Sequence, residues 1–157
     1  PLRDVGLHRF RFCINLFLFV SITANAEQAT DSPYYRAGNF VFISGQVAID
    51  PRTGKIVSDN TADQVNQIFK NLKATVEKAG GSMQDIVKLN IYMTDFDKAF
   101  PVVKAAIPNY FKPPYPARSP LGGIKLGSHM LLEIDAIMYI SPRSHASKGS
   151  LLSGKRL

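Results

Sequence analysis

The chain has 157 residues, of which 45% are hydrophobic and 20% are charged, as expected for one soluble globular domain with a substantial core. The formal net charge of +7 is unevenly placed: residues 39–140 hold eleven Lys/Arg and nine Asp/Glu, and residues 141–157 add four positive charges and no negative ones. No aromatic residue accompanies this basic tail, which does not favour nucleic-acid binding. The single cysteine, Cys13, excludes an internal disulfide, and the three histidines lack metal-ligand spacing.

Residues 1–26 have the features of an export signal. Three arginines precede an apolar run at 12–22 that is too short to span a bilayer, and residues 24–26 (ANA) fit a small-x-small cleavage pattern. An upstream extension or a buried strand is the alternative. The mature protein, with no membrane span, is then periplasmic or secreted if 1–26 is a signal peptide, and otherwise cytoplasmic.

The remaining chain predicts one domain at 27–141 and a basic, disordered tail at 142–157. The expected elements are strands at 39–44, 46–49, 86–94, 117–124 and 130–140, and helices at 61–79 and 98–111. This order indicates an α+β fold in which two helices cover one face of a sheet.

The first helix is the best marked. Thr61 and Gln64 match a capping box, and Gly80 ends the helix. Its apolar residues recur at helical spacing: Val65, Ile68, Phe69, Leu72 and Val76. In the second helix, Pro101 suits the first turn, whereas Pro108 should kink or end the helix.

The strand at 86–94 alternates, with Val87, Leu89, Ile91 and Met93 expected on one face. The last strand is apolar on both faces, with Met130, Leu132, Ile134 and Met138 on one face and Leu131, Ile137 and Tyr139 on the other. Since the two helices cover only one face, the other face predicts self-association.

The stretch 115–119 (YPARS) and Glu133 carry the chemistry. The guanidinium of Arg118 fits a carboxylate in two-point fashion, and a glutamate can hold and polarise a water. Together they predict a pocket for a small acid that water attacks. Asp135 lies on the same strand face as Glu133 and is expected to be structural.

These residues resemble the RidA family of reactive intermediate deaminases, also called the YjgF or L-PSP endoribonuclease family. The resemblance rests on three segments: residues 42–46 (FISGQ), residues 50–54 (DPRTG), and PARS at 116–119 followed by LEI at 132–134. It implies a chorismate-mutase-like fold and a homotrimer whose sheets form a central barrel, with sites at the subunit clefts. The implied activity is hydrolysis of enamine and imine acids, such as 2-aminoacrylate, to 2-keto acids and ammonia, without metal or organic cofactor.

By this resemblance, Arg118 grips the substrate carboxylate, and Glu133 positions the water and passes a proton to the departing amine. Because an imine is already electrophilic, orientation, carboxylate neutralisation and proton transfer suffice.

The resemblance also implies substrate-binding positions. Ser44 and Gly45 match the turn that lines the family pocket, and Tyr34 or Tyr35 matches a tyrosine that reaches a neighbouring subunit's cleft. Lys104 stands where the family has an asparagine. About three residues of the usual segment after Tyr34 are also missing, which puts substrate choice and rate in question.

Two other functions stay open. One is an RNA-acting protein, because some relatives are described as endoribonucleases or translation inhibitors. The other is a non-catalytic module that binds a small carboxylate through Arg118. The resemblance also gives a second interpretation of residues 22–26 (ITANA), as the family's opening strand.

Overall fold

The computed structural model describes residues 31–141, so the predicted export signal and basic tail lie outside the described residues. The elements are β1 (Tyr34–Ala37), β2 (Phe40–Gln46), β3 (Ile49–Asp50), β4 (Lys55–Ile56), α1 (Thr61–Lys78), a 3-10 helix (Met83–Asp85), β5 (Ile86–Met93), α2 (Phe96–Tyr110), β6 (Ala117–Leu121) and β7 (Leu132–Tyr139). The predicted α+β fold is confirmed.

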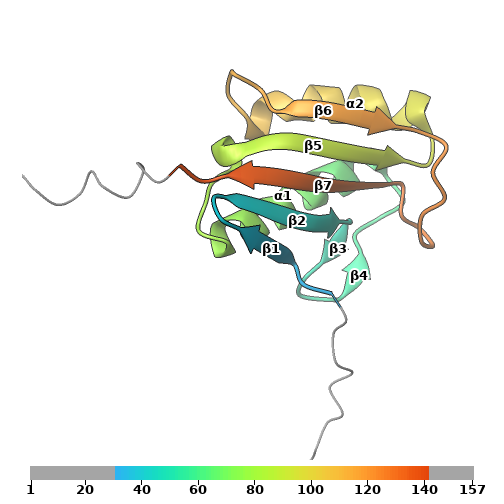
Figure 1. The fold of residues 1–157 in the computed structure, drawn as a ribbon. Helices are drawn as coiled ribbons and strands as arrows, with labels where there is room; N and C mark the ends of the chain where they lie inside the picture. Colours follow the sequence, from blue (N-terminus) through green and yellow to red (C-terminus); the bar gives the residue numbers. More distant parts are fainter. Residues whose placement is uncertain (1–30, 142–157) are drawn as a thin grey trace, which may run out of the picture. The chain divides into compact units, whose positions relative to one another are not determined.

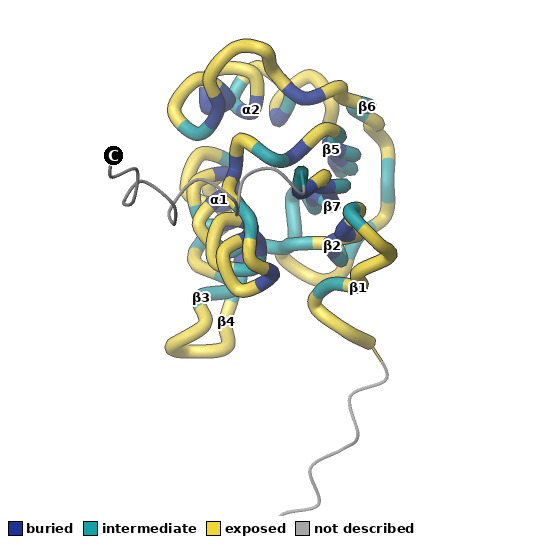
Figure 2. Tube along the Cα trace, turned by 60° about the vertical axis from the view of Figure 1, so that its left-hand side comes forward, coloured by how far each residue is buried: buried dark blue, intermediate teal, exposed yellow. Residues whose placement is uncertain are grey.

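The main sheet has five strands in the order β1-β2-β7-β5-β6, and β3 and β4 form a separate hairpin (Figure 1). All pairs in the main sheet are antiparallel except β5 and β6, which α2 connects. Both helices lie on the same side of the sheet (Figure 2). The predicted coverage of one face is therefore confirmed.

The apolar stripe of α1 was predicted correctly, because Val65, Ile68, Phe69, Leu72 and Val76 are all fully buried. The predicted capping box was wrong. Asn60 is the N-cap, and its Oδ1 accepts hydrogen bonds from the backbone N–H groups of Ala62 at 2.8 Å and Asp63 at 3.2 Å.

Gln64, the other half of that expected box, is fully buried and ties two loops to α1. Its Nε2 donates to the carbonyls of Ser58 and His129, both at 2.7 Å, and its Oε1 accepts from the Leu131 N–H at 2.9 Å. These bonds hold the loop before β7 against the start of α1. The backbone turns sharply there, since His129 has a φ of 61°.

Helix α2 begins two residues earlier than expected, because Asp95 caps it by accepting from the Lys98 N–H at 3.1 Å. Pro108 was predicted to kink or end the helix, and it does not end it, since α2 continues to Tyr110. Two short strands, β1 and β4, were not predicted.

The alternation of side chains predicted for β5 does not hold at the start of that strand. An irregularity between Ile86 and Lys88 buries Ile86 and leaves Val87 45% exposed, whereas Leu89 and Ile91 face the helices as expected. Beyond this slip the period of two holds, so Lys88, Asn90 and Tyr92 share the opposite, uncovered face.

That uncovered face carries large apolar side chains. Paired residues of neighbouring strands project to the same side, and the pairs there are Tyr35 with Phe42, Phe42 with Ile137 and Phe40 with Tyr139. Four of these rings are 38–70% exposed, and those of Phe40 and Tyr139 meet edge-on at 5.1 Å. The described residues include no element that covers them (Figure 2).

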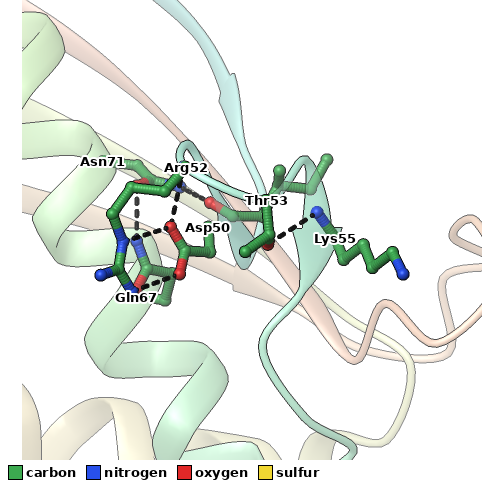
Figure 3. A network of polar contacts seen from close by, with 7 residues as sticks. Asp50, Arg52, Thr53, Lys55, Gln67 and Asn71 are labelled. Carbon is green, nitrogen blue, oxygen red and sulfur yellow. Dashed lines mark hydrogen bonds and ion pairs between the residues drawn. The ribbon is translucent and has the colours of Figure 1, made fainter.

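The segment after β2 is anchored to α1 through Asn71 (Figure 3). The Asn71 amide donates to the carbonyls of Val47 at 3.0 Å and Ile49 at 2.8 Å, and Gln67 donates to Asn71 Oδ1 at 2.8 Å. These bonds give the backbone just beyond the SGQ turn a fixed position.

The turn between β3 and β4 is stabilised by contacts between two of its own charged residues, Asp50 and Arg52 (Figure 3). Asp50 accepts from the Arg52 backbone N–H at 2.9 Å and pairs with the guanidinium at 2.9 Å. The hydrogen bond from the Arg52 side chain holds the pKa of the Asp50 carboxyl below its usual value, aided by the Arg52 N–H.

Candidate active site

Glu133 lies near the start of β7, in register with Tyr92 of β5, on the uncovered face of the sheet. On its other side is the backbone of Gly45. A side chain at position 45 would overlap the Glu133 carboxylate, since a Cβ there would lie 2.7 Å from Cδ and closer still to Oε1. The structure therefore brings together two predicted site residues, and glycine at 45 is what makes the approach possible.

Ser44 precedes this contact and is held by the residues that lead into β1. Its hydroxyl donates to the Ser32 carbonyl at 2.6 Å, and its backbone N–H donates to the Pro33 carbonyl at 3.1 Å. The Ser44 hydroxyl hydrogen is thus occupied, whereas its oxygen retains a lone pair for a ligand.

Arg118 occupies a different place. It lies on the edge strand β6 in register with Leu89, which is fully buried under the helices. Paired residues project to the same side, so the exposed Arg118 side chain belongs to the helix-covered side of the sheet. Lys88 confirms this assignment, because from the uncovered face its Nζ reaches Ser119 Oγ, at 2.6 Å, and not the intervening Arg118.

Within one chain, Arg118 and Glu133 therefore do not meet. They project from opposite sides of the sheet, and β5 lies between their strands. A single chain does not form the expected pocket, so a site that uses both residues needs a second copy.

The remaining predicted residues divide between these two places. Tyr34 is half-buried and packs against the chain's own core, whereas Tyr35 is 70% exposed on the uncovered face. Of the two tyrosines, Tyr35 is therefore the one free to contact another molecule. Lys104 is exposed on α2, next to the buried Val103, on the same side of the sheet as Arg118.

A polar cluster beside Glu133 was not predicted. Asp135 accepts a hydrogen bond from Asn90 Nδ2 at 2.7 Å and another from the Tyr92 hydroxyl at 3.1 Å. The bond to Asp135 raises the pKa of the Tyr92 phenol, and burial and the negative charges of Asp135 and Glu133 act in the same direction. The alternation in β5 puts Asn90 and Tyr92 on this face, but only the register with β7 pairs them with Asp135.

A cavity of about 340 Å³ opens between α1 and the segment after β2. Gly45 lines it, together with Gln46, Val47, Ile49, Pro51, Asn71, Ala74 and Thr75, and its walls are mainly apolar. Neither Arg118 nor Glu133 reaches it. Among residues 31–141, no three His, Cys, Asp or Glu side chains are grouped to hold a metal ion, and no helix of that part is long and apolar enough to cross a membrane.

Comparison with known proteins identifies relatives of this chain. The family model described as Endoribonuclease L-PSP matches residues 23–140, beginning inside the predicted export signal. The RutC family protein of Pyrococcus horikoshii is 39% identical over 123 residues, or 76% of this chain and 96% of the relative. The 2-iminobutanoate/2-iminopropanoate deaminase of Dermatophagoides farinae is 38% identical over 111 residues, or 69% and 86% of the two chains.

The crystal structure of RidA from the Antarctic bacterium Psychrobacter sp. PAMC 21119 superposes with a TM-score of 0.67 at 37% identity, covering 73% of this chain and 92% of that one. The three matches span 69–76% of this chain, and the Psychrobacter structure shares its fold. The chain therefore belongs to the RidA/YjgF/L-PSP family.

Proposed function

We propose that the protein hydrolyses reactive enamine and imine acids, of the 2-aminoacrylate and 2-iminopropanoate type, to 2-keto acids and ammonia. The observation that carries the proposal is the separation of Arg118 and Glu133 onto opposite sides of one sheet. Two copies, one contributing its helix-side edge and one its uncovered face, supply what a small anionic substrate needs.

The uncovered face supports such an assembly. Exposed aromatic rings cluster there, and burying apolar surface of this kind stabilises an association by roughly 25 cal/mol per Å² removed from water. The proposed assembly is a homotrimer, in which three uncovered faces turn inward as a barrel and three equivalent clefts form between neighbours. Tyr35, exposed on the same face, extends toward a neighbouring copy.

In each cleft Arg118 binds the substrate carboxylate through two parallel N–H···O bonds, which fixes the imine carbon in one orientation. Lys104, exposed on the same side of the sheet, adds positive charge at that edge. Ser44 and the Gly45 backbone line the opposite wall, next to Glu133.

The reaction adds one water and releases one ammonia. An enamine takes a proton from solvent at C3, or an imine takes one at nitrogen, and either becomes the iminium. Glu133, as general base, accepts a proton from the water while the water oxygen bonds to C2 and the C=N π electrons move onto the nitrogen, which gives a neutral carbinolamine. Glu133 then returns its proton to that nitrogen, the C–N bond breaks, ammonia leaves, and the hydroxyl proton returns to solvent to give the 2-keto acid.

The test is release of ammonia from freshly generated 2-aminoacrylate, with Arg118→Ala as the deciding variant. We expect at least about a hundredfold loss of kcat/KM, because the carboxylate loses its anchor. Arg52→Ala is the matched control: its guanidinium is also exposed but pairs with Asp50 in the β3–β4 turn. An Arg118→Ala protein that keeps its oligomeric state and full activity contradicts the mechanism.

The family description also names endoribonuclease activity, and the same preparations can be assayed on RNA. His129 is the only histidine among residues 31–141, so that part of the chain holds no histidine pair for acid–base cleavage of a phosphodiester. RNA cleavage that survives deletion of 142–157 and depends on core residues would favour this function. Stoichiometric binding of 2-keto acids without turnover would instead indicate a binding module.

A further inference from the structure

We propose that Tyr92 and Asp135 are positioning residues for Glu133, with Tyr92 forming the wall that keeps the Glu133 carboxylate against Gly45. This inference rests on the proposed function, since it assigns a role to residues that surround the proposed general base. Neither side chain needs to touch the substrate.

The first step concerns the two residues that flank Glu133 on the neighbouring strands. Strand β7 runs between β2 and β5, so Glu133 has one neighbour on each side. Toward β2, the missing side chain of Gly45 leaves the space that the carboxylate occupies. Toward β5, the residue in register is Tyr92, whose ring lies on the same face. Cross-strand neighbours of this kind stand about 4.5–5.5 Å apart at Cβ, so the ring limits how far Glu133 can turn away.

The second step is what fixes the ring. The Tyr92 hydroxyl donates to Asp135 Oδ2 at 3.1 Å, and Asn90 Nδ2 donates to Asp135 Oδ1 at 2.7 Å. Each carboxylate oxygen thus receives one hydrogen bond from β5, and Asp135 cannot turn without losing at least one of them. A hydrogen bond to a charged acceptor is stronger than one between neutral groups.

The third step concerns the surroundings of the cluster formed by Asn90, Tyr92 and Asp135. Around this cluster the uncovered face carries Lys88, which donates to Ser119, and the apolar side chains of Ile137 and Phe42, and assembly through this face would exclude water from the cluster. Hydrogen bonds that water no longer competes for hold geometry more firmly. The cluster would then be most rigid in the assembled form, in which Glu133 is proposed to act.

The kinetic test compares Tyr92→Phe and Asp135→Asn with wild type, in deaminase assays on 2-aminoacrylate. We expect kcat to fall about three- to tenfold in each, the worth of one such hydrogen bond, with KM within twofold. Tyr139→Phe is the matched control, because it also removes a phenolic oxygen from this face but pairs with Phe40 at the other end of the sheet. Its kcat should stay within twofold of wild type.

The deciding comparison repeats Tyr92→Phe in a Glu133→Gln background. A positioning residue acts only through Glu133, so Tyr92→Phe should cause no further loss there. An equal loss in both backgrounds, or a Tyr92→Phe kcat within twofold of wild type, would overturn the proposal.

A crystal structure of Tyr92→Phe gives a readout that needs no activity. We expect the Glu133 carboxylate to leave Gly45 or to occupy two rotamers, whereas an unchanged, single Glu133 conformer would overturn the proposal. Wild-type protein without deaminase activity would contradict the proposed function alone, and this structural comparison would still decide whether Tyr92 positions Glu133.

Discussion

Gly45 provides the space in which the Glu133 carboxylate lies. We expect Gly45→Ala to displace that carboxylate, because the new Cβ would overlap it. The displaced atoms are the mobile end of a side chain, so the free energy of unfolding should fall by only about 1 kcal/mol or less. Deaminase activity should fall at least about tenfold, since the proposed base is misplaced.

Urea denaturation and ammonia release, measured on the same preparation, check both parts of the Gly45 prediction. Gly45→Ala in a Glu133→Ala background is the control, because the clash is then absent and the stability cost should vanish. A large stability loss that persists in that background would mean that Gly45 is needed for its backbone conformation instead.

Tyr92 makes stability depend on pH in the alkaline range. Its pKa in the folded protein is raised, chiefly by the hydrogen bond to Asp135, above the ordinary value of about 10. The folded state therefore binds this proton more tightly than the unfolded state. The stabilisation is complete below the unfolded pKa and is lost as the pH rises through the folded pKa.

We thus expect the urea midpoint of wild type to fall as the pH is raised beyond about 10, and to fall less steeply in Tyr92→Phe. Burial also raises the pKa of Tyr110, so Tyr92→Phe should remove only part of the slope and Tyr110→Phe another part. Equal slopes in wild type and Tyr92→Phe would contradict the role given to the Asp135 bond.

At the scale of elements, two explanations of how α1 begins can be tested against each other: the cap by Asn60 and the predicted capping box of Thr61 and Gln64. Asn60→Ala should lower the free energy of unfolding by about 0.5–2 kcal/mol, because two backbone N–H groups lose their acceptor. Thr61→Ala should cost less than about 0.5 kcal/mol, since no capping hydrogen bond is made by Thr61. Chemical denaturation measures both, and the reverse order would restore the capping box that the sequence predicted.

The elements that the sequence predicted best are those with long, regular periodicity. The buried stripe of α1 and the alternation in β7 were both correct, because each is set by burial against one neighbour. Strand β1 was missed since its four residues are too few to show a period, and only pairing with β2 defines it. Val87 was misplaced because a strand irregularity depends on the partner strand.

The candidate site shows the same division. Arg118, Glu133 and Gly45 were predicted from short motifs, through resemblance to a family. The bonds of Asp135 with Asn90 and Tyr92 depend on the register of two strands more than forty residues apart, which no local pattern encodes. The opposite orientation of Arg118 and Glu133 likewise follows only from the registers of β6 and β7 with β5.

At the scale of the whole molecule, the uncovered sheet face should hold copies together. Phe42 is 46% exposed on this face, between its strand partners Tyr35 and Ile137, and a lysine there would place a charge in the proposed interface. We expect Phe42→Lys to shift sedimentation toward monomer and to lower deaminase activity in parallel. Val57→Lys is the matched control, because Val57 is 37% exposed in the loop between β4 and α1, away from this face.

A site shared between copies makes a stronger prediction, because two inactive chains can then repair each other. Arg118→Ala lacks the anchor and Glu133→Ala lacks the base, so each homotrimer should be inactive. In a mixed trimer, one cleft can receive Arg118 from a Glu133→Ala chain and Glu133 from an Arg118→Ala chain. Random mixing of equal amounts completes about one quarter of the clefts, since each site draws one residue from each of two copies.

We therefore expect about a quarter of wild-type activity after the two variants are unfolded together and refolded, and none after each is refolded alone and the products are combined without exchange. The double variant Arg118→Ala/Glu133→Ala mixed with wild type is the control, and it should dilute activity. Restoration requires that the guanidinium and the carboxylate act across a subunit boundary, as we propose from their positions on opposite sides of one sheet. Mixed trimers that form but stay inactive would show that both residues must come from the same chain, which this fold does not bring together.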